Sequence, residues 1–134
     1  NDLPLLRYIA AQGKPVIAST GMASLGEIER AVRTVREAGN PDLCLLKCSS
    51  AYPAPPDDMN LRTIPHLAET FGVAVGLSDH TLGSAAAVAA VVLGACVIRC
   101  AMISGRWNGR WARFSTECPL PKRGVPCSGV PCLS

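Results

Sequence analysis

Side chains that can bind anions or move protons recur directly after apolar runs of the sequence. Ser19-Thr20-Gly21-Met22 follows one such run, Ser49-Ser50-Ala51-Tyr52 a second and Ser78-Asp79-His80-Thr81 a third. Hydroxyl and backbone N–H groups suit a phosphorylated or carboxylated ligand. A carboxylate or an imidazole suits a divalent metal ion or a proton transfer. The three segments therefore predict an anion site with acid–base or metal chemistry, if the fold brings them together.

The stretches between these segments alternate between strand and helix patterns. Short continuous apolar runs predict buried strands at 15–18, 43–48, 73–77 and 95–98. Helices are predicted from Asp2 to Gly13, from the capping box Ser24–Glu27 to Gly39, over 61–71 and over 85–93. The first helix is expected to bury a stripe of Leu5, Leu6, Ile9 and Ala10. Pro65 is expected to shorten or kink the start of the third.

This order of elements predicts an α/β fold with about four parallel strands joined by helical crossovers. The joints from helix to strand are short, whereas those from strand to helix, such as 49–60, are long and polar. In parallel α/β folds the ligand site lies at the carboxyl ends of the strands. The hydroxyl-rich segments are therefore expected to share one rim, with the loop 49–60 as either a stiff connector or a substrate lid.

The composition is typical of a globular protein. The 134 residues are 49% hydrophobic and 17% charged, and the longest apolar stretch, 85–98, is too short for a membrane helix, which needs about 20 residues. The odd count of seven cysteines, with Cys44, Cys48 and Cys96 inside apolar runs, favours a reducing cytosol over a disulfide framework. No basic, then apolar, leader pattern is visible at Asn1, so we expect a cytoplasmic protein.

Charge and composition change near residue 98. Residues 1–98 carry seven basic and nine acidic side chains, whereas 99–134 carry six basic and one acidic. The second stretch also holds both tryptophans and four of the seven cysteines. We therefore predict a domain over 1–98 and an irregular basic tail over 99–134. Zinc ligation by Cys118, Cys127 and Cys132 has unsuitable spacing, and nucleic-acid binding by the tryptophans lacks any periodic framework to present them.

Three ordered motifs give the chain a resemblance to a known family. Residues 13–22 (GKPVIASTGM), 46–55 (LKCSSAYPAP) and 76–83 (GLSDHTLG) resemble the sialic acid synthases, the phosphoenolpyruvate-condensing nonulosonate synthases. The stretch 58–67 (DMNLRTIPHL) is most similar to the pseudaminic acid synthase branch. The resemblance covers 1–98 nearly continuously.

The resemblance implies a (β/α)8 TIM barrel, of which this chain would form part. It also implies a homodimeric enzyme that condenses phosphoenolpyruvate with an N-acetylated amino-sugar aldose and releases phosphate, with a divalent cation, Mn²⁺ or Mg²⁺. Four strands do not close an eight-strand barrel, which typically takes about 250 residues, so we expect the isolated chain to be inactive.

The family's site residues carry over by motif. The resemblance implies that His80 is a metal ligand, that Ser19, Ser49, Ser50 and Ser78 bind substrate, and that Tyr52 and Asp79 take part in catalysis. Without the family, a lone histidine such as His80 would more often be a capping or hydrogen-bonded loop residue than a ligand, but its Ser-Asp-His-Thr context after a strand favours the ligand. Ser19-Thr20-Gly21 could be a plain helix-entry turn, but the hydroxyls after two other strands favour a site. His66, on a helix beside the apolar stripe, is interpreted as a solvated surface residue.

The chain departs from the family after residue 98. Where the family continues Glu-Lys-His-Phe-Thr, whose histidine is its second metal ligand, this chain has Arg99-Cys100-Ala101-Met102-Ile103. Only Phe114-Ser115-Thr116-Glu117 briefly resembles the family again. We hypothesise that much of 99–134 is an out-of-frame or otherwise aberrant translation. Two alternatives stay open: another phosphoenolpyruvate- or phosphate-handling barrel enzyme, and a defective, non-catalytic fragment.

Overall fold

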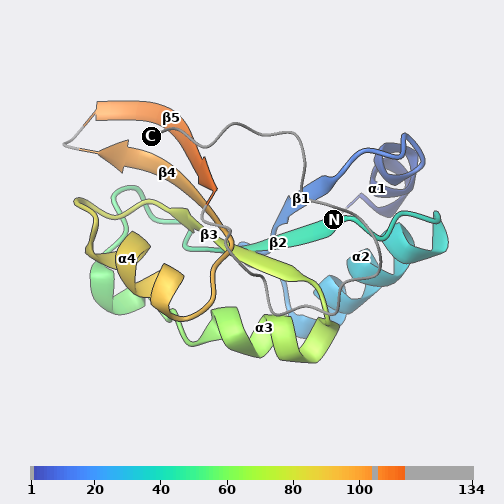
Figure 1. Ribbon diagram of the computed structural model, residues 1–134, viewed down its shortest axis with the longest axis horizontal. Helices are drawn as coiled ribbons and strands as arrows, with labels where there is room; N and C mark the ends of the chain where they lie inside the picture. The colour runs from blue at the N-terminus through green and yellow to red at the C-terminus, as the bar shows by residue number, and fades with distance from the viewer. Residues whose placement is uncertain (1, 104–105, 114–134) are drawn as a thin grey trace.

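The computed structural model describes residues 2–103 and 106–113, and the structural statements below concern these residues (Figure 1). In chain order the elements are α1 (Leu3–Ala10), β1 (Val16–Ser19), α2 (Leu25–Glu37), β2 (Leu43–Cys48), the 3₁₀ helix η1 (Pro56–Met59), α3 (Thr63–Phe71), β3 (Ala74–Asp79), α4 (Ala85–Val92), β4 (Val97–Ile103) and β5 (Arg106–Arg113).

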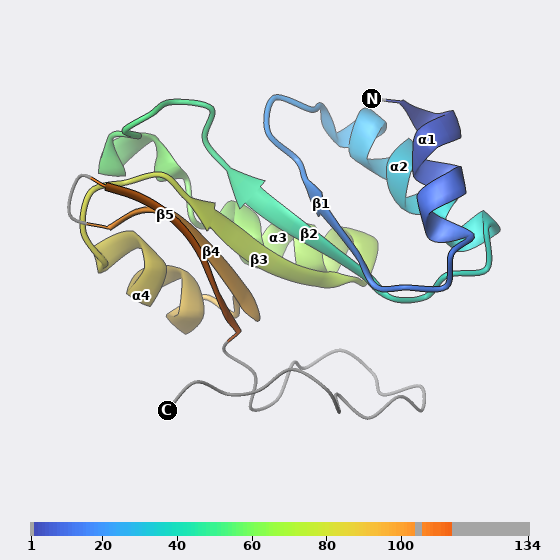
Figure 2. The same cartoon turned by 90° about the horizontal axis from the view of Figure 1, so that it is seen from above.

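The strands form one sheet in the order β1-β2-β3-β4-β5 (Figure 2). β1 to β4 run parallel to one another, and each is reached through a helix. Four such strand-and-helix units make up half of a (β/α)8 barrel. The predicted fold class, four parallel strands with helical crossovers, is therefore confirmed.

Local sequence signals start and end the helices as expected. The Ser24 N–H and hydroxyl both donate to Glu27 Oε2 at 2.8 Å, and the Glu27 N–H donates to Ser24 Oγ at 3.4 Å, which completes the capping box of α2. Asp2 caps α1 by accepting from the Leu5 N–H at 3.0 Å. α3 begins at Thr63, two residues later than predicted, and holds Pro65 in its first turn, where the missing N–H is tolerated.

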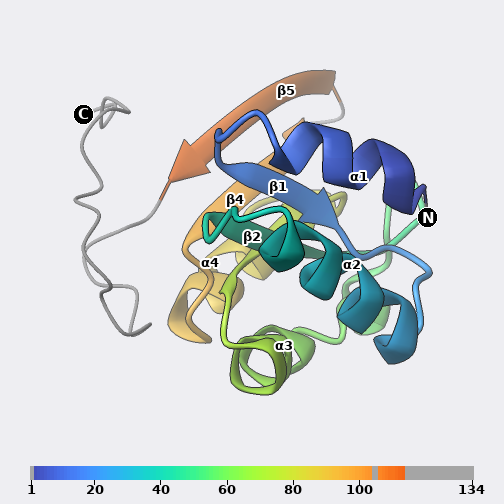
Figure 3. The same ribbon diagram turned by 90° about the vertical axis from the view of Figure 1, so that its right-hand side faces the viewer.

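The apolar core lies between the helices and one face of the sheet. α3 packs on β2 and β3, α4 packs on β3, and α1 packs against α2 (Figure 3). Leu45, Leu77 and Ile98 alternate onto the helix-covered face and are at most 2% exposed. On the opposite face, Gly76 lies so close to Leu46 and to the Val97 carbonyl that a Cβ there would overlap both. The centre of the sheet is therefore tightly packed on both faces.

The expected buried stripe of α1 is wrong for two of its four residues. Ala10 is buried and Leu6 is half-buried, but Leu5 is 53% exposed and Ile9 43% exposed. The reason is position: α1 contacts α2 at the β1 edge of the sheet, and no other described element covers its outer side. The apolar spacing was a correct helix signal but an incomplete burial signal.

The predicted irregular tail from residue 99 is corrected where the structure describes it. β4 runs through residue 98 to Ile103, and β5 pairs with it antiparallel, with Ile98 opposite Ala112 and Arg99 opposite Trp111. The open hydrogen-bonding edge of β4 can pair with any extended segment, so β5 needs no alternating apolar pattern to form. The reading-frame hypothesis stays a prediction. Residues 104–105 and 114–134, including Phe114–Glu117, Cys118, Cys127 and Cys132, lie outside the described residues.

Two further expectations concern surfaces. His66 is exposed on α3, as predicted. Among the residues that the structure describes, no helix has the length and apolar character needed to cross a bilayer.

Candidate functional site

The carboxyl ends of β1, β2 and β3 lie at the same edge of the sheet. Their parallel register pairs Ser19 with Leu46 and Cys48 with Ser78. The loops that leave these ends carry the three hydroxyl-rich segments (Figure 2). The shared rim expected from the sequence is therefore present.

His80 is the centre of the hydrogen bonding at this rim. It follows β3 directly and is 3% exposed. Its Nδ1 lies 2.7 Å from the Ser49 carbonyl oxygen, and its Nε2 lies 3.0 Å from Ser78 Oγ and 3.1 Å from the Tyr52 hydroxyl. Because a carbonyl oxygen only accepts, Nδ1 carries the proton of a neutral ring. Nε2 is then an acceptor, and the hydroxyls of Ser78 and Tyr52 both lie within hydrogen-bond distance of it.

The loop after β2 is fastened onto His80. The Tyr52 and His80 rings stack with their centroids 4.0 Å apart and an angle of 24° between their planes. The Ala54 N–H donates to the His80 carbonyl at 2.9 Å. Tyr52 nevertheless remains 61% exposed, so one side of its ring faces solvent. These contacts connect the loop to the site, and the choice between a stiff connector and a substrate lid stays open.

Asp79 and Thr81 flank the histidine and bond to each other. Asp79 Oδ1 accepts from the Thr81 N–H at 2.9 Å and from the Thr81 hydroxyl at 2.8 Å. Both residues are 2% exposed. Asp79 alternates with Ser78 along β3 and pairs in register with Cys100, so it lies on the helix-covered face. Among the described residues, its carboxylate makes no hydrogen bond to Ser78, His80 or Tyr52, and its catalytic role stays a prediction.

The remaining predicted serines lie at the rim but outside this hydrogen-bonded centre. Ser49 takes part through its backbone carbonyl, and Ser19 and Ser50 are exposed. Within the described ranges, the side chains of Ser19 and Ser50 make no hydrogen bond to His80. Their substrate-binding roles therefore stay predictions, compatible with groups left open to a ligand.

Two residues beside the predicted set also shape the rim. The Thr20 hydroxyl donates to the Leu46 carbonyl at 3.0 Å, and the Gly21 N–H donates to Cys48 Sγ at 3.2 Å, which together join the β1 loop to β2. The sequence placed Thr20 in a rim segment without assigning it a role, and it did not indicate Cys48 as a rim residue. The Ser-Thr-Gly turn signal was available for Thr20, whereas nothing in the sequence pairs a cysteine of β2 with a glycine of the β1 loop.

Burial shifts two ionisable groups near the rim. Desolvation lowers the pKa of Lys47, an effect that the nearby Cys48 opposes, and the Lys47 ammonium donates to the Cys48 carbonyl at 2.9 Å. Burial, reinforced by the negative charge of Asp79, raises the pKa of the Cys100 thiol. Both side chains therefore favour their neutral forms more than they would in water.

His80 is oriented so that its Nε2 could serve as one ligand of a divalent metal ion. The Nδ1–H bond to a backbone carbonyl is the arrangement that orients metal-binding histidines, and it leaves Nε2 as the donor atom. A cation at Nε2 would have to displace or share the hydroxyls of Ser78 and Tyr52. No group of three histidine, cysteine, aspartate or glutamate side chains that could hold a metal ion is present in the described part of the chain.

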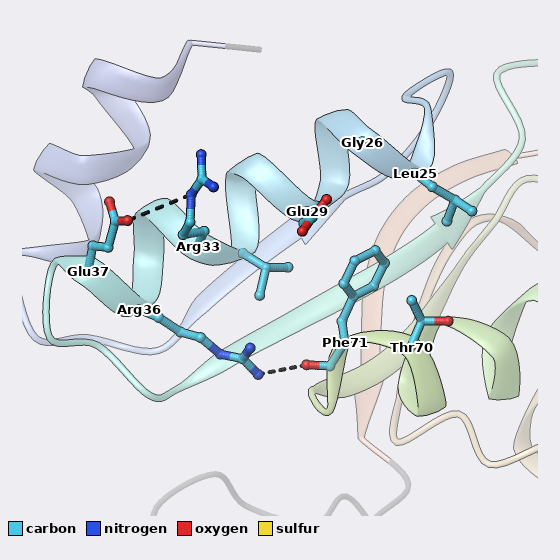
Figure 4. Close-up of a pocket in the computed structure, with 9 residues that line it drawn as sticks. Leu25, Gly26, Glu29, Arg33, Arg36, Glu37, Thr70 and Phe71 are labelled. Carbon is cyan, nitrogen blue, oxygen red and sulfur yellow. Dashed lines mark hydrogen bonds and ion pairs between the residues drawn. The ribbon is translucent and has the colours of Figure 1, made fainter.

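A groove on the outer surface is separate from this rim. It lies between α2 and α3 and is lined by residues that include Leu25, Arg36 and Phe71 (Figure 4). Arg36 spans it and donates to the Phe71 carbonyl at 2.6 Å. The groove is the gap between two neighbouring helices of the outer layer, on the helix side of the sheet, and it contains none of the rim residues.

Comparison with known proteins gives one family. The NeuB family model matches residues 1–118. Pseudaminic acid synthase of Campylobacter jejuni is 51% identical over 98 residues, a match that spans 73% of this chain and 29% of that protein. The chain thus spans less than a third of the length of that relative.

Solved structures agree in fold. The Bacillus subtilis spore coat polysaccharide biosynthesis protein spsE superposes with a TM-score of 0.71 at 42% identity, covering 73% of this chain and 28% of that one. The N-acetylneuraminic acid synthetase of Leptospira borgpetersenii superposes with a TM-score of 0.70 at 37% identity, covering 74% and 35%. With a family model that matches most of its length and a half-barrel shared with these two proteins, the chain belongs to the NeuB family.

Proposed function

We propose that the enzyme represented by this chain condenses phosphoenolpyruvate with an N-acetylated amino-sugar aldose, such as N-acetylmannosamine or a 2,4-diacetamido-trideoxyaltrose, and releases phosphate. One observation carries the proposal: a buried imidazole, His80, bonded to Ser78 and Tyr52 at the carboxyl ends of parallel strands in a NeuB-family chain. Ligands of parallel α/β enzymes bind at this end of the sheet.

The proposed reaction needs anion binding and proton handling. C3 of phosphoenolpyruvate attacks the sugar aldehyde carbon, water adds at C2, and the bond from C2 to the phosphate oxygen breaks. The exposed hydroxyls of Ser19 and Ser50 suit the charged phosphate and carboxylate. The hydroxyl of Tyr52, which lies 3.1 Å from His80 Nε2, can pass a proton where the aldehyde oxygen gains charge.

We also propose that a divalent cation, Mn²⁺ or Mg²⁺, uses His80 Nε2 as one ligand, with further ligands from outside the described residues. When bound, such an ion would act as a Lewis acid at the aldehyde oxygen. The full-length enzyme is proposed to be a cytoplasmic homodimer with phosphoenolpyruvate and an amino sugar as its reactants, and with neither nucleic acid nor membrane as a partner.

A chimera tests the activity. Residues 1–98 would replace the matching segment of Campylobacter jejuni pseudaminic acid synthase, and phosphate release would be followed with phosphoenolpyruvate, Mn²⁺ and each candidate sugar. We expect sugar-dependent phosphate release, and a loss of about 100-fold or more for His80→Ala in the chimera. His66→Ala, which changes an exposed histidine of α3, is the matched control and should keep full activity. A folded chimera that releases no phosphate with any of these sugars would refute the proposal.

A defective, non-catalytic fragment is the second candidate. Two observations favour it: Arg99-Cys100-Ala101 replaces the Glu-Lys-His of the family motif, and β5 runs antiparallel on the edge where a barrel would add a parallel strand. Under this proposal the 134-residue chain, incubated with phosphoenolpyruvate, Mn²⁺ and the same sugars, releases no phosphate above background. Clear turnover by the isolated chain would exclude it.

A further inference from the structure

We propose that Asp79 is a positioning residue that acts through Thr81 to hold His80 in its Nδ1–H tautomer, facing Ser78 and Tyr52. The importance of this for catalysis rests on the function proposed above. The positioning itself does not, and it is measurable without any substrate.

Asp79 and Thr81 close a turn that contains His80. Asp79 Oδ1 accepts both from the Thr81 backbone N–H and from the Thr81 hydroxyl, at 2.9 and 2.8 Å. A side chain that accepts from the N–H two residues ahead closes a turn around the residue between them. Here that residue is His80, and both flanking residues are 2% exposed. Two bonds to one buried oxygen therefore fix the backbone on both sides of the histidine.

Three contacts of His80 depend on the position of that backbone. The His80 carbonyl accepts from the Ala54 N–H at 2.9 Å, Nδ1 donates to the Ser49 carbonyl at 2.7 Å, and the ring stacks on Tyr52. All three partners belong to the loop after β2, whereas Asp79 is the last residue of β3 and Thr81 lies just after it. A displacement of residue 80 would thus lengthen three contacts at once, including the one that sets its tautomer.

The place of Asp79 in the sheet distinguishes a positioning role from direct catalysis. Asp79 lies on the helix-covered face of β3, opposite Ser78, and its charge is near Cys100, whose thiol pKa it helps to raise. A direct proton-transfer role needs an ionised carboxylate that reaches the reactants. A positioning role needs only an oxygen that accepts from Thr81, which an asparagine also supplies.

The test uses the 134-residue chain with ¹⁵N-labelled histidine, whose two ring nitrogens report the tautomer by NMR at about pH 8, where a histidine of ordinary pKa is neutral. The variants are Asp79→Ala, Asp79→Asn, Thr81→Val and Thr81→Ser. His66, exposed on α3, is the internal reference signal in every sample. Nuclear Overhauser contacts between the rings of Tyr52 and His80 provide a second measurement of orientation.

We expect the Nδ1–H tautomer of His80 to dominate in the unsubstituted chain and in the Asp79→Asn and Thr81→Ser variants. In Asp79→Ala the ratio of the Nδ1–H to the Nε2–H tautomer of His80 should fall about tenfold, since both hydrogen bonds from Thr81 to Asp79 are lost. The contact between the Tyr52 and His80 rings should weaken as well. Thr81→Val, which keeps the backbone N–H, should give a smaller fall in the same direction. If Asp79→Ala does not fold, the comparison of the His80 tautomer between Thr81→Val and Thr81→Ser decides whether the positioning role holds. An unchanged tautomer in folded Thr81→Val and in any folded Asp79→Ala sample would overturn the proposal.

The chimera separates this proposal from the function. There Asp79→Asn should keep kcat within about threefold, whereas Asp79→Ala should lower it by more than tenfold. Loss of activity in Asp79→Asn with an unchanged His80 tautomer would overturn the positioning role in favour of a catalytic carboxylate. An inactive chimera with the expected tautomer shifts would instead remove the proposed function and leave the positioning intact.

Discussion

The ends of β1 and β3 share a sequence pattern but differ in the burial and hydrogen bonding of their serines. Each has a buried apolar run followed by hydroxyl residues, yet Ser78 is 1% exposed and bonded to His80, whereas Ser19 is exposed. β3 pairs with β2 and β4, while β1, in the described part of the chain, pairs with β2 alone. The comparison teaches that a strand-end motif becomes a preorganised site only where neighbouring strands surround it.

The largest contrast is expected between core positions of the two strands. Leu77→Ala in β3 removes a side chain with no exposed surface and should lower the free energy of unfolding by about 2–5 kcal/mol. Ile17→Ala in β1 changes a side chain that is 48% exposed and should cost less than about 1.5 kcal/mol. Urea unfolding of both variants measures the difference. Equal costs would contradict the contrast between centre and edge.

A glycine at the centre of the sheet gives the next largest effect. A Cβ added by Gly76→Ala would overlap the Val97 carbonyl and the Leu46 side chain, so we expect a loss of about 1–3 kcal/mol. Gly26→Ala is the matched control, because it lies in α2 with open space around its Cβ and should stabilise the chain by up to about 1 kcal/mol. Thermal unfolding compares them, and a neutral Gly76→Ala would show that β3 and β4 can move apart.

Serine truncations at the two strand ends sharpen the comparison. Ser78→Ala removes a buried hydrogen bond to His80 and should cost about 1 kcal/mol. Ser19→Ala changes an exposed hydroxyl and should stay within about 0.5 kcal/mol of the unsubstituted chain. Chemical denaturation with both variants in parallel gives the values. A larger cost for Ser19→Ala than for Ser78→Ala would reverse the comparison.

The smallest expected effect is the pH dependence from Lys47. Because its pKa is lowered in the folded chain, the unfolded chain binds more protons between that pKa and the ordinary value of 10.5, and stability from this group rises with pH there. Lys47→Met should remove that rise. Cys100 has the opposite sign, since its raised pKa makes stability fall as the pH climbs above the ordinary value of 9.0.

The measurement for Lys47 therefore uses a Cys100→Ala background, in which unfolding free energies are compared between neutral pH and about pH 10.5. Lys14→Met, which changes an exposed lysine before β1, is the control and should leave the pH profile unchanged. An identical profile for Lys47→Met and its background would mean that burial does not perturb this lysine.

Much of the fold was predictable because its signals are local. The capping box of Ser24 and Glu27 places the start of α2, and Gly72, whose φ is +58°, ends α3 in the left-handed conformation that glycine tolerates. The exposure of Leu5 and Ile9 was not predictable, since it depends on which elements cover α1. β5 was missed because an edge strand forms through backbone pairing, which leaves little trace in a sequence rich in arginine and tryptophan.

By itself, the sequence determined the order of the elements from α1 to β4, the parallel arrangement of four strands and the place of the hydroxyl-rich segments at one rim, because turn, cap and apolar-run signals act over a few residues. Only the tertiary structure decided which of those groups meet. His80 lies within hydrogen-bond distance of Ser49, Ser78 and Tyr52, whereas Ser19 and Ser50 are exposed at the rim. The reason is that the contacts of His80 with Tyr52 and Ser49 join residues 28 and 31 positions apart, through a sheet register that no local pattern specifies.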